Sequence, residues 1–344
     1  MSALWGRRGA ASQPTMVGEK AAVHPGREAI PEPRSAGRAE PTSVPKQLVV
    51  LSGKGGTGKT TVTAALGSMA RRKVLADCDV DAPDLHLLLD LVPVSREVFR
   101  AGKEARIITE RCCRCGLCTD YCRFDAIRAT ANGDGEKPLY VVDPVSCEGC
   151  GLCALVCTSK AVDMIEPERG HWMVSDTRLG PLVHARLAIG GENSGKLVTL
   201  VREQALTLAR ERHLDLVIVD GPPGVGCPVI ASVAGADLVL AVTEPTVSGV
   251  HDLERLMTLV RTFKVPLAVC INKCDLNREM TTQIERLCAA SEIEIVGRIA
   301  YDTTAVEAQV EARSIIEYNA GPMVDQLRAM WAGIENKLNI IVEE

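Results

Sequence analysis

Aromatic residues are scarce in this chain of 344 residues, which contains three Trp, four Tyr and three Phe. So few rings provide a poor supply of stacking platforms for single-stranded nucleic acid. An excess of positive charge is also missing, because 39 Lys and Arg residues are outnumbered by 44 Asp and Glu residues. Nucleic acids and anionic membrane surfaces are bound through basic patches. We therefore expect no nucleic-acid partner.

Long apolar runs are missing as well. Nothing approaches the ~18 apolar residues of a membrane span, and the basic start of the chain is not followed by the apolar stretch of a secretory signal. These absences predict a cytoplasmic protein without membrane insertion. Residues 1–45 are rich in proline and have no helix or strand periodicity, which predicts a disordered N-terminal extension or an overextended start of the chain.

From residue 46 onward, short apolar segments alternate with helical segments. Buried strands separated by helices are typical of a mostly parallel sheet in an α/β fold, covered on both faces. The alternation stops near Ala105 and resumes after Glu168. We therefore expect residues 46–104 and 169–344 to form one domain, into which residues 105–168 are inserted.

The first connection from a strand to a helix carries a motif of the form G-x-x-x-x-G-K-[ST]. Its glycines let backbone N–H groups curl around phosphates, and the helix that follows presents the positive end of its dipole. We expect Lys59 to reach the β- and γ-phosphates and Thr60 to coordinate Mg²⁺. The expected nucleotide-binding residues of this P-loop are Gly53, Lys54, Gly55, Gly56, Thr57, Gly58, Lys59, Thr60 and Thr61.

Acidic residues follow two of the predicted strands. Asp220 ends the strand LDLVIVD, where a Walker B aspartate would help to hold Mg²⁺. Asp77 and Asp79 end the second strand. One of them could orient water and the other could bind Mg²⁺, and either could instead be a carboxylate at a helix N-terminus.

Lys54 adds a second lysine to the loop, in the pattern K-G-G-x-G-K-[ST]. With this lysine the domain resembles the deviant Walker A ATPases of the MinD/ParA type, which have a P-loop NTPase fold of the SIMIBI-like kind. The resemblance implies that ATP lies between the subunits of a homodimer, and that Lys54 reaches across to the partner's phosphates. It also implies catalytic roles for Lys54 and Lys59, and a water-orienting role for Asp79.

Asn272 is the residue that this resemblance assigns to adenine recognition. The same segment, Asn272-Lys273-Cys274-Asp275, also fits the N-K-x-D pattern that reads guanine in GTPases. The lysine signature is the rarer match and favours ATP over GTP.

Cysteine, by contrast, is abundant, with 14 residues. Eight of them form two runs of C-x2-C-x2-C-x3-C, the spacing of a bacterial two-cluster ferredoxin, in which the fourth cysteine of each run ligates the other cluster. Zinc sites also use C-x2-C pairs, but zinc leaves the doubled fourth cysteine unexplained. The first [4Fe–4S] cluster is therefore assigned to Cys112, Cys115, Cys118 and Cys157, and the second to Cys122, Cys147, Cys150 and Cys153.

Taken as a whole, the arrangement resembles the MinD-superfamily ATPases that carry an inserted ferredoxin domain. This resemblance implies the parts of the protein and not its activity. Two clusters held close together, as the ferredoxin resemblance implies, would pass single electrons, so we expect an ATPase that gates electron transfer to an unknown redox partner protein, by analogy with the nitrogenase iron protein. The alternative is an ATPase that assembles or carries iron–sulfur clusters, although the chain lacks the C-terminal C-x-x-C of such carriers. Cys113 is not expected to be a ligand. A resemblance to the nitrogenase iron protein would place a subunit-bridging cluster ligand close to Cys227, but that site needs a second cysteine per subunit, so Cys227 is expected to be a small buried residue.

Overall fold

The structure is a computed structural model that describes residues 44–131, 137–188, 190–191 and 193–339. Nearly all of the predicted N-terminal extension, residues 1–45, lies outside the described residues. The main sheet has nine strands in the order β13-β12-β11-β1-β10-β2-β9-β8-β3. Its strands are β1 (Lys46–Ser52), β2 (Lys73–Asp77), β3 (Val92–Arg100), β8 (Glu168–Thr177), β9 (Gly180–Leu187), β10 (Leu216–Pro223), β11 (Leu238–Thr243), β12 (Leu267–Asn272) and β13 (Glu294–Ile299).

The strands from β13 to β9 are parallel to their neighbours, whereas β8 is antiparallel to both β9 and β3. The mostly parallel α/β sheet predicted from the apolar runs is therefore confirmed. β3, β8 and β9 are additions that the apolar pattern did not indicate. β3 exposes most of its residues and β8 is mainly half-buried, so neither carries the continuous apolar run of a central strand.

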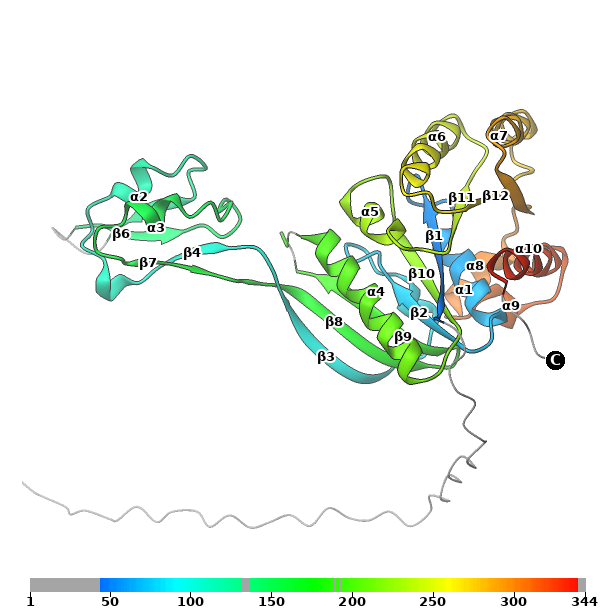
Figure 1. Cartoon of the computed structure of the whole chain (residues 1–344), viewed down its shortest axis with the longest axis horizontal. Helices are drawn as coiled ribbons and strands as arrows, with labels where there is room; N and C mark the ends of the chain where they lie inside the picture. The colour runs from blue at the N-terminus through cyan, green and yellow to red at the C-terminus, as the bar shows by residue number, and fades with distance from the viewer. Residues whose placement is uncertain (1–43, 132–136, 189, 192, 340–344) are drawn as a thin grey trace, which may run out of the picture. The chain divides into compact units, whose positions relative to one another are not determined.

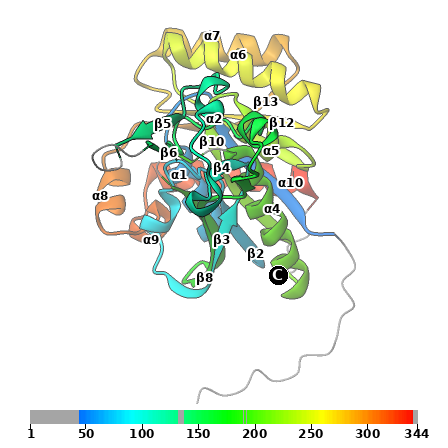
Figure 2. The same ribbon diagram turned by 90° about the vertical axis from the view of Figure 1, so that its left-hand side faces the viewer.

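Helices cover both faces of the main sheet (Figures 1 and 2). Successive strand residues point to opposite faces, and β1 illustrates this, because Val49 packs into one core and Leu48 into the other. The first core is covered by α4 (Ser194–Glu211), α5 (Cys227–Val233), α6 (Val247–Thr262) and α7 (Arg278–Ala290). The second is covered by α1 (Lys59–Met69), η1 (Leu85–Leu88), α8 (Thr304–Val310), α9 (Ile315–Tyr318) and α10 (Pro322–Leu338).

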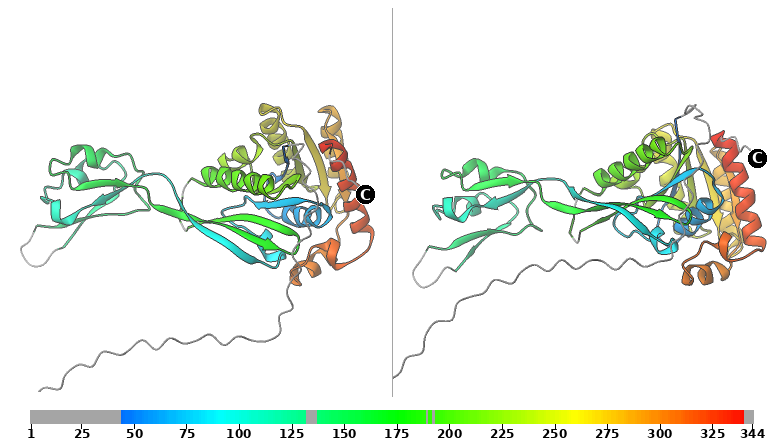
Figure 3. Two further views of the ribbon diagram at one scale, coloured as in Figure 1. Left: turned by 60° about the horizontal axis from the view of Figure 1, so that its bottom comes forward. Right: turned by 90° about the horizontal axis from the view of Figure 1, so that it is seen from below.

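Between β3 and β8 the chain forms a separate cysteine module, which we define as residues 104–165. Figure 3 shows β3 and β8 side by side as they lead to it. The module contains two short two-stranded sheets and short helical segments. Its elements are β4 (Glu104–Ile107), η2 (Thr109–Arg111), α2 (Leu117–Asp120), β5 (Ile127–Thr130), β6 (Leu139–Val142), α3 (Leu152–Val156) and β7 (Val162–Ile165).

The cysteine module is built from two equivalent halves, 35 residues apart in the sequence (147 − 112 = 35 for the first cysteines). β4 pairs with β7 and β5 with β6, so each small sheet joins one half to the other. Asp125 and Lys160, at equivalent positions, share a left-handed φ of 51°. The two halves therefore fold as one unit, because neither can complete a sheet alone. Among the described residues, no helix is long and apolar enough to cross a membrane.

Candidate functional site

The P-loop follows β1 and leads into α1, as its motif predicts. β1 pairs with β10 and β10 with β2, all in parallel, so the ends of these strands meet at one edge of the sheet. Gly58 has a left-handed φ of 90°, and a Cβ built on it would lie 2.3 Å from the Asn272 Nδ2 atom. Glycine is required here, since another residue would be strained and would also displace the neighbouring side chain.

Asp220 is the centre of the polar network in this site. Its side chain is fully buried and accepts hydrogen bonds from Lys59 Nζ at 2.9 Å, Thr60 Oγ1 at 2.8 Å and Thr63 Oγ1 at 2.9 Å. The structure thus brings together Asp220, Lys59 and Thr60, which the sequence had assigned to phosphate and Mg²⁺. Thr63 was not predicted, because its position one turn along α1 becomes informative only once Asp220 is placed opposite it.

Asp77 and Asp79 lie on the same side of the site. Lys59 Nζ is 3.9 Å from the Asp79 carboxylate, and Asp77 is fully buried, where it accepts hydrogen bonds from the backbone N–H groups of Asp79 and Leu85. Burial raises the pKa of Asp77 well above its usual range, and the carboxylate of Asp220 adds to this shift. Burial also raises the pKa of Asp79.

The charge balance of this site suits a divalent cation. Burial by itself would lower the pKa of Lys59, but the carboxylates of Asp220, Asp77 and Asp79 outweigh it, so the pKa is raised and the ammonium stays charged. One ammonium thus faces three carboxyl groups. In the described part of the chain, no three Asp, Glu, His or Cys side chains gather closely enough to hold a metal ion by themselves. Mg²⁺ is usually held by one or two carboxylates together with phosphates and water, which this donor set allows.

The P-loop leaves room and polar groups for phosphates. Gly55 and Gly56 face open space on the side where a Cβ would project. Thr57 is 2% exposed, and its hydroxyl has no hydrogen-bond partner among the described residues. A buried hydroxyl without a partner is costly, and a phosphate oxygen would satisfy it.

Lys54 lies within its own chain's site. Its ammonium is 2.7 Å from Glu244 Oε1 and donates hydrogen bonds to Thr246 and Ser248 at 3.2 and 2.9 Å. Glu244 also pairs with Lys273 Nζ at 3.0 Å. Burial would raise the pKa of Glu244, but the two lysines together hold it below its usual value. The carboxylate of Glu244 was not identified from the sequence, because it follows β11, far from the loop along the chain.

Asn272 contacts the P-loop directly in this structure. Its side-chain amide donates to the carbonyl of Thr57 at 2.7 Å, and the residue is 7% exposed. Lys273 Nζ donates to the carbonyl of Gly56 at 3.1 Å, and Asp275 accepts a hydrogen bond from the backbone of Tyr301. The Asn272 segment therefore supports the phosphate loop. Adenine recognition by Asn272 stays a prediction.

The predicted cluster ligands gather around two cavities in the cysteine module. One cavity is lined by Cys122, Cys147, Cys150 and Cys153. The other is lined by Cys112, Cys115, Cys118 and Cys157, and also by Cys113. The fourth cysteine of each run thus lines the cavity of the other run, and ligation of a cluster there stays a prediction. Cys113 is an exposed fifth cysteine on the second cavity.

The donors around these cavities suit an iron–sulfur cluster. All fourteen cysteines are free thiols, and the backbone N–H of Ala161 donates to Cys157 Sγ at 3.2 Å. Gly116 and Gly151 have left-handed φ angles of 82° and 77° and precede the helices that carry the third cysteine of each run.

Comparison with known proteins identifies the family. The model of the CobQ/CobB/MinD/ParA nucleotide binding domain matches residues 48–315 of this chain. The chain belongs to this family. Its P-loop, Asp220 and Mg²⁺-compatible acids are thus part of a nucleotide-binding domain of the CobQ/CobB/MinD/ParA kind, for which ATP and Mg²⁺ are fitting ligands.

Proteins similar to this chain carry different names. It is 36% identical over 241 residues to an uncharacterized protein of Methanocaldococcus jannaschii, covering 67% of this chain and 79% of that protein. It is 25% identical over 313 residues to a protein of Pyrococcus horikoshii named iron-sulfur cluster carrier protein, covering 86% and 87% of the two chains. The structure of the septum site-determining protein MinD of Pyrococcus horikoshii with Mg-ADP has a TM-score of 0.50 at 17% identity, and the match covers 84% of this chain and 96% of that one. This last likeness concerns the fold.

Cys227 corrects one expectation for this CobQ/CobB/MinD/ParA domain. It was predicted to be a small buried residue, but the structure exposes it at the first position of α5. The core-facing side of this short helix is formed by Val229, Ser232 and Val233. The helical period therefore turns Cys227 toward the surface.

Proposed function

We propose that this chain is an ATP-binding iron–sulfur protein, in which the nucleotide state controls electron transfer through two [4Fe–4S] clusters. The observation that carries the proposal is the lining of the two cavities. Each is lined by one complete set of four cysteines, with the fourth supplied by the other half of the module. This ferredoxin-like ligation would hold one cluster on Cys112, Cys115, Cys118 and Cys157, and the other on Cys122, Cys147, Cys150 and Cys153.

The bound clusters would supply one-electron chemistry, and the thiolates would hold them firmly. Each cluster would be tied to both halves of a module whose two small sheets also join the halves. Releasing a cluster would therefore disturb the fold of the whole module. Retention during redox turnover is the behaviour that this arrangement favours.

The nucleotide site would provide the control. When nucleotide binds, Lys59 would contact phosphate oxygens and Thr60 would contact Mg²⁺, in place of their present hydrogen bonds to Asp220. Asp79 would orient the attacking water. Lys54 would leave Glu244 to reach the nucleotide of a second subunit, so the ATP-bound form would be a homodimer. Glu244 would then hold the signature lysine in its own subunit until the dimer forms.

The second candidate function is assembly or carriage of iron–sulfur clusters. The names of the Pyrococcus relatives favour it, at 24–25% identity. Against it stands the arrangement of the remaining cysteines in this domain, because Cys270 and Cys288 are fully buried in the core, and the more accessible Cys227 and Cys274 do not form a C-x-x-C pair. Electron transfer therefore remains the preferred function.

Anaerobic redox titration followed by EPR tests the proposal. The reconstituted protein would be titrated with and without ATP and Mg²⁺, beside a Lys59→Ala variant that lacks the phosphate contact. We expect two [4Fe–4S] signals whose midpoint potential shifts with nucleotide in the natural chain and stays constant in the variant. A midpoint potential that does not change with nucleotide, together with transfer of clusters to an apo-acceptor, would refute nucleotide-controlled electron transfer and support the carrier function.

A further inference from the structure

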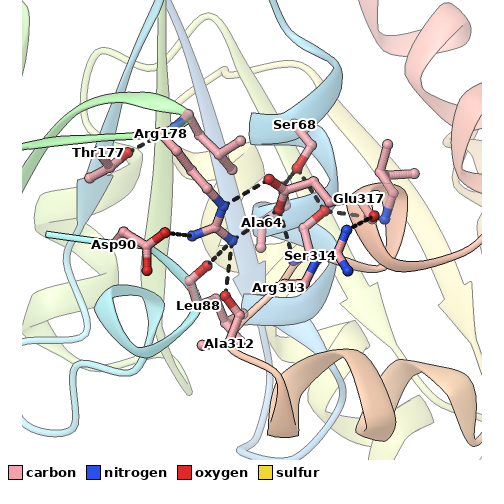
Figure 4. A network of polar contacts seen from close by, with 12 residues as sticks. Ala64, Ser68, Leu88, Asp90, Thr177, Arg178, Ala312, Arg313, Ser314 and Glu317 are labelled. Carbon is pink, nitrogen blue, oxygen red and sulfur yellow. Dashed lines mark hydrogen bonds and ion pairs between the residues drawn. The ribbon is translucent and has the colours of Figure 1, made fainter.

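Arg178 lies in the turn between β8 and β9 and joins three segments of the chain (Figure 4). Its guanidinium donates to the backbone carbonyls of Leu88 at 2.6 Å and Ala312 at 2.9 Å. It also donates to both carboxylate oxygens of Glu317, at 2.8 and 3.0 Å, and lies 3.5 Å from Asp90. The planar guanidinium is the side chain best suited to such a forked, charge-assisted set of bonds. We call this set of contacts the Arg178 clamp.

The first segment held by the clamp begins at the acids of the nucleotide site. Asp77 accepts a hydrogen bond from the backbone N–H of Leu85, the first residue of η1. Leu88, whose carbonyl the clamp holds, is the last residue of the same short helix. η1 therefore connects Asp77, beside Lys59, to the carbonyl that Arg178 holds, through a single turn of helix.

The second segment belongs to α8 and α9, which contact the P-loop helix. Gln309 in α8 donates to the hydroxyl of Thr61 at 2.6 Å, and Thr61 directly follows the Mg²⁺ candidate Thr60. Ser314 is the N-cap of α9, and its hydroxyl oxygen lies 2.6 Å from the hydroxyl oxygen of Ser68 in α1. The backbone N–H of Ser314 donates a hydrogen bond to the carboxylate of Glu317. Glu317 thus joins the clamp to the helix that starts at the phosphate loop.

The third segment is the β8–β9 turn itself, which belongs to the strands that lead to the cysteine module. β8 follows β7 after two residues, and β3 begins at Val92, two residues after Asp90. The two strands pair along their whole length, from Val92 with Asp176 to Arg100 with Glu168. The clamp therefore lies at the end of the strand pair formed by Val92 and Asp176, and the opposite end, at Arg100 and Glu168, leads to the cysteine module.

We propose that Arg178 is a positioning residue that transmits the state of the nucleotide site to β3 and β8. The effect on the clusters rests on the proposed function. The response of β3 and β8 to nucleotide, which we call the strand response, does not depend on whether clusters are bound. Phosphates that recruit Lys59 would take its charge away from Asp220, which accepts hydrogen bonds from Thr60 and Thr63 of α1, and from Asp77, which anchors η1. Arg178 bonds to elements on both of these paths, so a change in either path would alter its contacts and through them the start of β3 and the end of β8.

Hydrogen exchange on the full chain tests the inference, with and without ATP and Mg²⁺. The natural chain should change its exchange at residues 92–100 and 168–177 when nucleotide binds. Arg178→Lys keeps the charge but loses the forked bonds, and should lose this response while keeping ATP affinity. Glu317→Gln provides a second, milder variant in case Arg178→Lys does not fold. Arg298→Lys is the matched control, because Arg298 forms an exposed pair with Glu285 at 2.7 Å.

The redox titration separates this inference from the proposed function. A strand response in the natural chain that persists in both clamp variants would overturn the role of Arg178, and so would the absence of any strand response to nucleotide. A strand response that depends on the clamp but leaves the cluster potential unchanged would support the inference and refute nucleotide control of electron transfer. Loss of both the strand response and the potential shift in the clamp variants supports both proposals.

Discussion

Cross-ligation of the two clusters is tested by removing cysteines in pairs. Cys122 lines the cavity of Cys147, Cys150 and Cys153, although it belongs to the first run. The variant Cys122→Ala with Cys150→Ala therefore removes two ligands from one cluster and leaves the other complete. The variant Cys118→Ala with Cys122→Ala removes two cysteines of the same run, but one from each cavity.

The expected iron contents follow from this arrangement. The natural chain should hold about eight iron atoms in two clusters. The Cys122 and Cys150 variant should keep about four, as one [4Fe–4S] cluster with an unperturbed EPR signal. The Cys118 and Cys122 variant should keep no unperturbed cluster, since each cluster has lost the thiolate at one iron. Iron and sulfide analysis and EPR on anaerobically purified protein measure both quantities.

The opposite pattern would refute the reasoning. If each run of four cysteines holds its own cluster, the Cys118 and Cys122 variant keeps one unperturbed cluster and the Cys122 and Cys150 variant keeps none. Cys113→Ala serves as the control, because Cys113 is exposed on the cavity wall and is not in either set. This variant should retain both signals.

Three further predictions concern the nucleotide domain. Asp220→Asn removes the buried carboxylate that Lys59 contacts at 2.9 Å and should lower the free energy of unfolding by about 3 kcal/mol, measured by urea titration. Gly58→Ala should cost about 1–3 kcal/mol in backbone strain and weaken binding of a fluorescent ATP analogue, whereas Gly333→Ala in α10 should not affect binding. Burial, with a smaller effect of His86, lowers the pKa of His184 to about 4. Its neutral form therefore stabilises the fold at neutral pH, and this stability, about 3 kcal/mol, is lost as pH falls from about 6.5 to 4. A His184→Gln variant whose stability falls as steeply with pH would contradict this assignment.

Local patterns in the sequence were sufficient for the parts whose residues are neighbours in the chain. The P-loop can be recognised because Gly53 to Thr60 form one continuous turn between a strand and a helix. The two cysteine sets can be assigned because fixed spacing decides which thiols face the same cavity. The buried parallel strands are visible because central strands need apolar residues on both faces.

Only the tertiary structure determined the contacts between residues that are distant in the sequence. Glu244 and Lys273 meet Lys54 because β11 and β12 end at the same edge of the sheet as β1, and no local pattern encodes that meeting. Cys227 is exposed because the helical period of α5 turns it away from the core. The Arg178 clamp joins a strand turn, a short helix and α9. Arg178 bonds to the backbone carbonyls of Leu88 and Ala312, and because every residue has such a carbonyl, the residue types at these positions do not indicate the contact. Such contacts depend on how the elements pack and not on their order in the chain.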